Sequence, residues 1–407
     1  MEDEGKQAHL KLSGVVKGVH AKLRQNLRQS AGDYESVWQA HCQDKALLGE
    51  YADAMRSLAT EFWSKRPETR IDWCRSTCVE YFHGGGLQKA LAKDARRNLF
   101  RHQQEENSED SEPKDMTLDF SEMAAASAAA SSPTAELSDS SGSYSQTTLS
   151  SSEPDLMFGS PEASLEDRRR KIYERYPAPL YSSISVPFEG PIRLLDVGSC
   201  YNPFQQHSEF LAIGIDISPA VESVHQCDIL SVELTQQPLQ LAKDSLLTYF
   251  KTLPRVIPQL PRCSFHVVVY SLLLEYFPAR YQRWLCCQRA HQLLMRNGLL
   301  LIITPDSHAV HKNAAQMRAW KTAIESLGFR RWRYVKQEHL HCMAFRKTED
   351  EAPLTLIGGA DLMSIPQDSQ QEEEEEQDHT QYLFGSLPRN DCDFFRDAFS
   401  ELPDLVD

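Results

Sequence analysis

Three aspartates and one glycine stand at positions where they could bind a nucleoside. Asp196 and Gly198 end an apolar run in "LLDVGSCYNPF". Asp216 ends a second apolar run, and Asp228 follows in "HQCDIL". An acid that closes the second strand of a parallel sheet, about 20 residues after the first loop, can accept both ribose hydroxyls. An aspartate one segment later can accept a hydrogen bond from an adenine amine, with Ile229 packing on the ring. Each aspartate alone could equally cap a helix, so the interpretation depends on the set.

The first loop lacks the glycines that a dinucleotide-binding loop uses. The pattern G-x-G-x-x-G is absent, and residues 199–203 read Ser-Cys-Tyr-Asn-Pro. Such a loop has no evident cradle for a pyrophosphate. The aspartates therefore favour a ligand that contains ribose and adenine but no phosphates, and S-adenosylmethionine is such a cofactor.

The elements that must position these residues alternate between strand and helix from Pro191 onward. Apolar runs predict strands at 192–198, 210–217, 265–274 and 299–306. Helical patterns lie between or after them at 238–253, 281–298 and 313–329. This alternation predicts an α/β fold with a parallel sheet that is covered on both faces. Residues 330–340 and 341–347, with almost no connection, predict an antiparallel hairpin at one edge.

The rest of the chain divides into three further regions by composition. Residues 7–102 show apolar positions at intervals near 3.6 and predict a helical domain. Residues 103–165 are acidic and rich in serine, which predicts a disordered insert. Residues 166–347 form the predicted Rossmann-like domain, and residues 348–407 are expected to be a disordered acidic tail.

The net charge of −15 is distributed unevenly along the chain. Residues 103–167 carry −14 and residues 348–407 carry −15, which leaves +14 for the remaining residues. A basic body with acidic attachments fits protein partners at least as well as RNA. The ten cysteines show no disulfide-like framework, and no apolar stretch reaches the ~18 residues of a membrane span. We therefore expect reduced thiols in the cytosol or nucleus, and no membrane span.

Two other groups of residues could suggest a site. Cys74 and Cys78 lie one helical turn apart, but no second pair or nearby histidine accompanies them, so buried core thiols are favoured over a zinc site. His266 lies near the start of the strand at 265–274. We interpret it as a structural histidine at a strand end. The sequence thus predicts no metal site.

Several motifs resemble one known family. "LLDVGSCYNPF", "GIDISPAVESVHQCDIL", "FHVVVYSLLLEYFP" and "GLLLIITPDS" are similar to the family that unites a fungal ribosomal RNA adenine-N1 methyltransferase with animal S-adenosylmethionine sensors. "KLSGVVKGVHAKLR" and "RIDWC" resemble the animal branch. The resemblance covers residues 11–102 and 191–347. It implies a Rossmann-like class I methyltransferase sheet of seven strands, the last one antiparallel, with an N-terminal helical domain packed over the ligand site.

The resemblance also implies roles for individual residues in binding S-adenosylmethionine. Gly198 would let the backbone approach the methionine part, and Ser271 would line the pocket from the fourth strand. Arg70 would extend from the helical domain toward the ligand carboxylate, which a guanidinium suits. A surface position is the alternative for Arg70. The implied cofactor-binding set is Arg70, Gly198, Asp216, Asp228, Ile229 and Ser271.

The resemblance implies a cytoplasmic sensor rather than a demonstrated enzyme. The ligand-free form would engage the GATOR and KICSTOR complexes and restrain mTOR signalling, and S-adenosylmethionine would release it. Recruitment to the lysosomal surface through these partners stays open. The alternative is an S-adenosylmethionine-dependent RNA (adenine-N1) methyltransferase. No N-P-P-Y-type tetrad is present and "SLLLEYF" is apolar, but adenine N1 has its own lone pair and needs orientation more than a base. Catalysis therefore stays open, and sensing is favoured.

Overall fold

The computed structural model describes residues 2–65, 69–106, 190–238, 243–306, 310–337, 339–350 and 358–368. The chain divides into two units. The first consists of residues 1–90 and 186–407, and the second consists of residues 91–185. In the second unit the described residues are 91–106, which belong to helix α5 (Gly86–Glu106). Residues 107–165 of the predicted insert lie outside the described residues.

The N-terminal residues form a set of helices, as their apolar periodicity predicts. Val16, Val19 and Leu23 are buried on one side of the first helix. The continuous helical pattern after it divides at Asp44, whose carboxylate accepts a hydrogen bond from the backbone N–H of Leu47 and so begins a new helix. The helices of this part are α1 (Glu2–Gln29), α2 (Tyr34–Gln43), α3 (Lys45–Ser57) and α4 (Arg70–Phe82), with shorter turns over Leu58–Phe62 and Trp63–Lys65.

The main sheet in the described residues has seven strands in the order β3-β2-β1-β6-β7-β9-β8. The first five in that order are parallel, and β9 runs antiparallel to both β7 and β8. This confirms the predicted parallel sheet with an antiparallel hairpin at one edge. The strands are β1 (Ile192–Val197), β2 (Phe210–Asp216), β3 (Val224–Gln226), β6 (Phe265–Ser271), β7 (Leu294–Pro305), β8 (Phe329–Gln337) and β9 (Leu340–Lys347). A separate parallel pair consists of β4 (Glu233–Leu234) and β5 (Gln259–Leu260).

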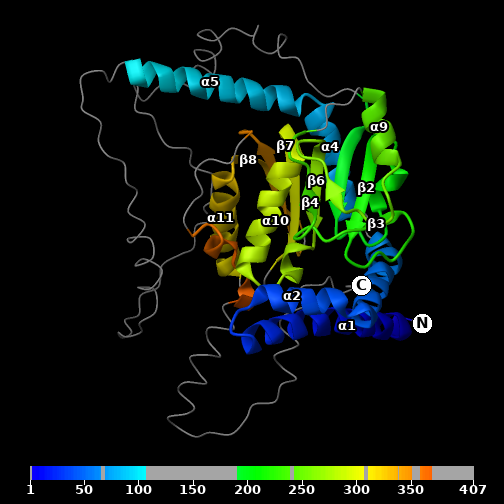
Figure 1. Cartoon of the computed structure of the whole chain (residues 1–407). Coiled ribbons are helices and arrows are strands. Elements are labelled where there is room, and N and C mark those ends of the chain that lie inside the picture. The colour runs from blue at the N-terminus through cyan, green and yellow to red at the C-terminus, as the bar shows by residue number, and fades with distance from the viewer. Residues whose placement is uncertain are drawn as a thin grey trace, which may run out of the picture. The chain divides into compact units, whose positions relative to one another are not determined.

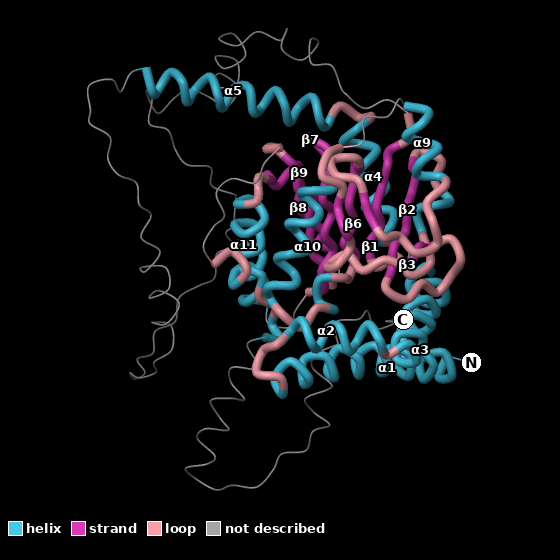
Figure 2. The backbone as a smooth tube through the Cα atoms, viewed as in Figure 1, coloured by secondary structure: helices cyan, strands magenta, loops and turns pink. Residues whose placement is uncertain are grey.

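Helices cover both faces of the main sheet (Figure 2). Tyr270 and Ser271 are consecutive residues of β6, so their side chains point to opposite faces. The hydroxyl of Tyr270 donates to the carbonyl of Cys286 in α10 (Arg280–Leu293), whereas Ser271 accepts a hydrogen bond from Arg70 at the start of α4. Helix α10 therefore lies on one face and α4 on the other. The remaining helices of this region are α9 (Lys243–Lys251) and α11 (Val310–Ser326).

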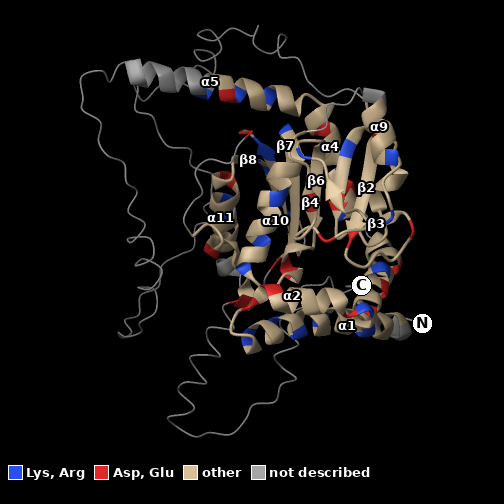
Figure 3. Ribbon diagram, viewed as in Figure 1, with Lys and Arg blue, Asp and Glu red and all other residues tan. Residues whose placement is uncertain are grey.

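Helices α1, α2 and α3 lie across the edge at which the parallel strands end (Figure 1). Arg24 of α1 donates to the carbonyl of Glu275, and the thiol of Cys200 donates to the carbonyl of Ala52 in α3. Charged residues lie mostly on the helices and at strand ends, while the central strands carry few of them (Figure 3). This edge of the sheet is the place where open α/β folds bind ligands.

Two boundaries differ from the sequence analysis, and the first is the end of α10. The helical pattern at 281–298 predicts a helix closed by Gly298, but α10 ends at Leu293 and β7 begins at Leu294. The buried amine of Lys347 donates to the carbonyls of His291 and Leu294, at 2.8 and 2.9 Å. A lysine from β9 thus binds carbonyls at the end of the helix, and the residues after it join the sheet.

The second boundary concerns the tail. Residues 358–368, which we call the strap, pack onto α10 and α11. Met363 and Ile365 are buried, and so is Asp368. The acidic composition around the strap predicts disorder for the whole tail, and for these residues that prediction is wrong. A short segment with two apolar residues and one paired acid gives no distinct compositional signal. Residues 351–357 and 369–407 lie outside the described residues.

Candidate functional site

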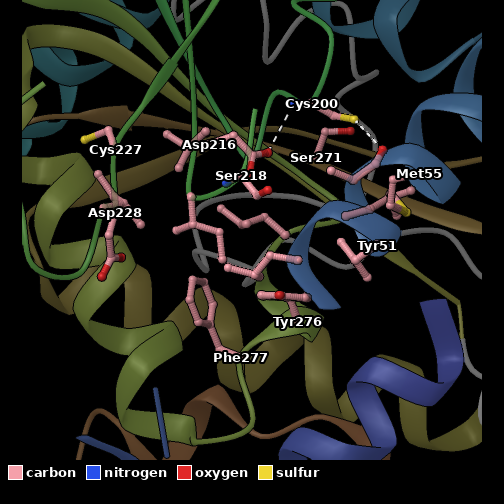
Figure 4. A pocket seen from close by; sticks show the side chains of 18 of the residues that line it. Tyr51, Met55, Cys200, Asp216, Ser218, Cys227, Asp228, Ser271, Tyr276 and Phe277 are labelled. Atoms are coloured by element: carbon pink, nitrogen blue, oxygen red, sulfur yellow. Dashed lines mark hydrogen bonds between the residues drawn. The ribbon is translucent and has the colours of Figure 1, made fainter. Parts of the chain in front are cut away.

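A cavity of about 700 Å³, including its open mouth, lies between the N-terminal helices and the carboxyl ends of β1, β2 and β6 (Figure 4). Of the residues predicted to bind a cofactor, all but Arg70 line it: Gly198, Asp216, Asp228, Ile229 and Ser271. The cavity is lined further by the sequence neighbours of these residues and by side chains of α2 and α3, among them Trp38, Tyr51, Ala52 and Met55. The fold thus brings together side chains from distant parts of the sequence.

Asp216 ends β2 and presents a carboxylate to the cavity. One of its oxygens, Oδ1, accepts the backbone N–H of Ser218 at 2.8 Å, and Oδ2 accepts that of Cys200 at 3.2 Å. Burial raises the pKa of Asp216 to about 6, although these two N–H groups act in the opposite direction. A carboxylate oxygen has two lone pairs. Each oxygen of Asp216 can therefore accept one more donor, which is what a pair of vicinal hydroxyls supplies.

Asp228 is held by a residue of the N-terminal helices. Its Oδ2 accepts the indole N–H of Trp38 at 3.0 Å and the hydroxyl of Ser231 at 2.9 Å. Its Oδ1 accepts the backbone N–H of Leu230 at 2.9 Å. Ile229, beside it, is buried. An additional amine donor at this position would have to bind Oδ1, because Oδ2 already accepts two hydrogen bonds.

The loop after β1 adopts an unusual backbone conformation. Gly198, Cys200 and Asn202 have φ angles of 70°, 56° and 53°, and Leu272 at the end of β6 has φ of 58°. Positive φ costs free energy for residues other than glycine, and such residues cluster at functional sites. A Cβ on Gly198 would lie 2.8 Å from Cδ1 of Leu273, a residue that also lines the cavity. A side chain at 198 would therefore adopt an unfavourable φ and displace the end of the Leu273 side chain.

Arg70 lies behind the cavity wall rather than in it. Its Nε donates to the hydroxyl of Ser271 at 3.0 Å, and its guanidinium lies 4.8 Å from the ring centre of Trp63. Thr69 and Asp72 form a capping box that begins α4 at this residue. Arg70 is half-buried and attached to a cavity residue, which differs from the surface alternative.

Asp196, at the end of β1, lies behind the same wall. Its Oδ2 accepts the hydroxyl of Ser199 at 2.7 Å. Burial raises the pKa of Asp196 to about 7, while Ser199 and the charge of Arg70 act in the opposite direction. Asp196 is 4% exposed and does not line the cavity. It organises the loop, and Asp216 is the acid of the pair that a ligand can contact.

Sequence reasoning missed an aromatic wall that closes the cavity from the helix side. Tyr276 contacts Tyr51 at 5.0 Å and Trp38 at 5.9 Å between ring centres, and Trp38 contacts Phe277 at 5.1 Å. The hydroxyl of Tyr276 bonds to Nε2 of His41, whose pKa burial lowers to about 4. Helical spacing indicated only that Trp38 and Tyr51 were apolar positions. Identifying these two residues as part of the cavity wall requires knowing how α2 and α3 pack against the sheet, which helical spacing does not reveal.

Cys74, Cys78 and His266 were interpreted from the sequence as structural residues, and all three are buried. Cys74 and Cys78 are both fully buried in α4, and burial raises the pKa of each thiol. Nδ1 of His266 accepts the backbone N–H of Arg193 at 3.0 Å. In the residues that the structure describes, no helix is long and apolar enough to cross a membrane.

The fold and the site define a protein with the class I methyltransferase architecture and a cavity at the carboxyl ends of its parallel strands. The chain belongs to the family of the S-adenosylmethionine sensor upstream of mTORC1. It is 42% identical over 407 residues to the protein of that name from Xenopus tropicalis, covering 98% of this chain and 85% of the relative. The Danio rerio protein of the same name is 42% identical over 367 residues, covering 89% and 77%.

Comparison with family models found no match. Among solved structures, the chain has similarity to the N-methyltransferase NodS from Bradyrhizobium japonicum in complex with S-adenosyl-l-homocysteine. The TM-score is 0.28 at 14% identity, covering 46% of this chain and 90% of that chain. The Thermus thermophilus 16S rRNA N2 G1207 methyltransferase matches with a TM-score of 0.24 at 17% identity, covering 43% and 39%. The fold is assigned from the strand order rather than from these scores.

Proposed function

We propose that this chain binds S-adenosylmethionine in the cavity and acts as an S-adenosylmethionine sensor upstream of mTORC1. The observation that carries the proposal is the carboxylate of Asp216, which ends β2, faces the cavity and keeps one acceptor position on each oxygen. Two hydroxyls of a ribose match this pair of acceptors. The family of the chain supports the same ligand.

The other predicted residues receive matching roles in this proposal. Asp228 accepts the adenine amine on Oδ1, and Ile229 packs on the adenine ring. The backbone at Gly198 lies close to the methionine part, and Ser271 lines the same end. Arg70 remains bonded to Ser271 in the described structure. Its approach to the ligand carboxylate would require a change of side-chain rotamer.

The switch would follow from the composition of the cavity wall. Residues of α2 and α3 line one side and strand ends of the sheet line the other. A ligand that contacts both stabilises the arrangement in which they are together, and it shifts the population by its differential affinity for the two arrangements. In the proposal, the ligand-free arrangement binds GATOR and KICSTOR in the cytoplasm and restrains mTORC1. Ligand binding weakens that association.

Calorimetry with S-adenosylmethionine tests the ligand. Wild type should bind, and Asp216→Asn should bind at least about tenfold more weakly, because an amide offers one acceptor oxygen where the carboxylate offers two. Glu222→Gln is a matched control, since Glu222 is exposed and does not line the cavity. Equal binding by wild type and Asp216→Asn would contradict the proposed ribose site.

Association with partners tests the sensor role. Purified GATOR and KICSTOR complexes should retain the chain without S-adenosylmethionine and release it when the ligand is added. Asp216→Asn should stay associated at ligand concentrations that release the wild type. Association that is independent of ligand would reject the switch while leaving ligand binding intact.

A second candidate, an RNA adenine methyltransferase, is favoured by one observation. Outside its two acidic regions the chain carries +14, and RNA affinity depends largely on neutralising phosphates. Against it, the wall beyond Ser271 consists of Leu272, Leu273, Tyr276 and Phe277, which offers little to orient a base by hydrogen bonding. Transfer of labelled methyl groups from S-adenosylmethionine to total RNA, with sustained turnover, would decide for the enzyme.

A further inference from the structure

The strap is anchored to the α10 and α11 face of the sheet by buried contacts. Met363 is fully buried and Ile365 is 2% exposed. The indole N–H of Trp320 in α11 donates to the carbonyl of Ser364 at 2.8 Å. The strap therefore belongs to the same packed body as the cavity, although residues 351–357 before it lie outside the described part of the chain.

Arg283 of α10 connects the strap to the cavity wall. It is fully buried and donates in three directions. Its Nε donates to the carbonyl of Met363 at 2.7 Å, and its Nη1 donates to the carbonyl of Phe277 at 2.8 Å. Its Nη2 pairs with Oδ2 of Asp368, which also accepts the backbone N–H of Ile365 at 3.0 Å. One guanidinium thus binds two points of the strap and one residue of the site.

Phe277 connects Arg283 to the residues that line the cavity. It lines the cavity, and its ring lies 5.1 Å from that of Trp38. Trp38 donates in turn to Asp228. Arg283 binds the backbone carbonyl of Phe277. The position of the aromatic rings at the Asp228 end of the cavity therefore depends on Arg283.

We propose that Arg283 and Asp368 are positioning residues of the ligand site, so that docking of the strap and binding of ligand stabilise each other. The inference depends on the proposed binding of S-adenosylmethionine. A buried guanidinium needs a partner for its charge and for each N–H, because an unpaired buried charge is strongly unfavourable. When the strap is docked, Asp368 and Met363 supply these partners and leave Nη1 directed at Phe277. When the strap leaves, Arg283 must turn toward water or toward Glu275, and Phe277 loses its support.

Thermodynamic linkage gives the expected size of this coupling between strap docking and ligand binding. If loss of the strap contact weakens ligand binding by a given factor, ligand must strengthen strap docking by the same factor. Coupling between sites in proteins typically corresponds to roughly 5- to 150-fold, so we expect an effect of about tenfold. A strap that only adds stability would show no such reciprocal effect.

The first experiment uses the full-length chain with Asp368→Asn. This change keeps the size of the side chain and removes the charge that pairs with Arg283 and with Nε of Arg280 at 3.4 Å. Calorimetry should give a Kd for S-adenosylmethionine about tenfold higher than that of wild type. Asp361→Asn is the matched control, because Asp361 lies in the same strap but is exposed, and its Kd should not change. A folded Asp368→Asn protein that binds as tightly as wild type would overturn the inference.

The second experiment uses the wild type, so it holds even if Asp368→Asn fails to fold. Amide hydrogen exchange of residues 358–368 should slow by about tenfold at saturating S-adenosylmethionine, beyond any slowing in β8, none of whose residues lines the cavity. Unchanged exchange in the strap would reject the coupling. Absence of S-adenosylmethionine binding by wild type would instead reject the proposed function, so the two failures are distinguishable.

Discussion

Asp216 and Asp228 belong to the same cavity but have different hydrogen-bonding capacity. Asp216 accepts one backbone N–H on each oxygen, whereas Oδ2 of Asp228 already accepts two donors, one of them from Trp38. Asp216 can therefore take two hydroxyls, and Asp228 can take one further donor on Oδ1. This difference fits the proposal that Asp216 accepts two ribose hydroxyls and Asp228 one adenine amine.

The backbone at Gly198 leads to the first prediction. Gly198→Ala should weaken binding of S-adenosylmethionine, because the added Cβ would lie 2.8 Å from Leu273 Cδ1 and force that side chain to move. Left-handed backbone adds about 1–2 kcal/mol of destabilisation. Gly32→Ala is a suitable control, since Gly32 also has a positive φ but no atom lies near its Cβ position. Both variants should lose stability in urea, and calorimetry should show weaker binding only for Gly198→Ala.

The protonation of Asp216 predicts a pH dependence of binding. In the ligand-free protein the pKa of Asp216 is about 6, above its ordinary value because of burial. Hydroxyl donors favour the ionised form, so ligand must lower this pKa. Affinity should therefore be constant above about pH 7 and fall as pH decreases through 6, by at most about tenfold per pH unit for one proton. Calorimetry between about pH 5 and 8 should show this decline in wild type, and Asp216→Asn should lack it.

At the scale of elements, α2 is the helix that joins the N-terminal part to the ligand site. Trp38 is buried and donates across to Asp228, and its neighbour His41 bonds to Tyr276. Asp33 begins α2 by accepting the backbone N–H of Ser36, and Asp44, which ends α2, accepts the backbone N–H of Leu47 at the start of α3. Docking of α2 therefore depends on a few polar contacts within an aromatic cluster.

Trp38→Phe tests this docking. The substitution keeps an aromatic ring but removes the N–H that Asp228 accepts. A hydrogen bond to a charged group contributes about 1.5–3 kcal/mol, so the free energy of unfolding should fall by about 2 kcal/mol. Tyr34→Phe, which removes an exposed hydroxyl bonded to Glu35 on the same helix, should change it by less than about 0.5 kcal/mol. Urea denaturation followed by circular dichroism measures both, and equal stability of the two variants would contradict the role of Trp38.

At the scale of the whole molecule, residues 1–90 and 186–407 form one unit with the cavity inside it. The walls of the cavity come from both of these segments of the sequence. A ligand that fills the cavity should therefore stabilise the helices and the sheet together.

Thermal and urea unfolding test this expectation. S-adenosylmethionine at about 100 times its Kd should raise the free energy of unfolding of wild type by about 2.7 kcal/mol. Hydrogen exchange should slow in both α2 and β2, because residues of both elements line the cavity. Protection confined to the sheet would show that the N-terminal helices do not take part in binding.

Much of the fold could be predicted from local patterns. Apolar runs at β1, β2, β6 and β7 and the hairpin β8–β9 were evident, because strands buried on both faces must be continuously apolar. The end of α10 was not evident, because it depends on Lys347, distant in the sequence, binding its last carbonyls. The strap was not evident either, because its buried pair with Arg283 forms only when two distant segments meet.

The sequence by itself determined the strand-end acids and their order, since an apolar strand that ends in aspartate places that carboxylate at the edge of a parallel sheet. It also placed Gly198 in the loop directly after the first apolar strand. Only the tertiary structure decided that Trp38, Tyr51 and Tyr276 line the cavity, that Arg70 binds Ser271, and that Arg283 of α10 binds both the strap and the carbonyl of Phe277. Each of these contacts joins segments whose meeting depends on how the helices pack on the sheet, and no local pattern of residues encodes that packing.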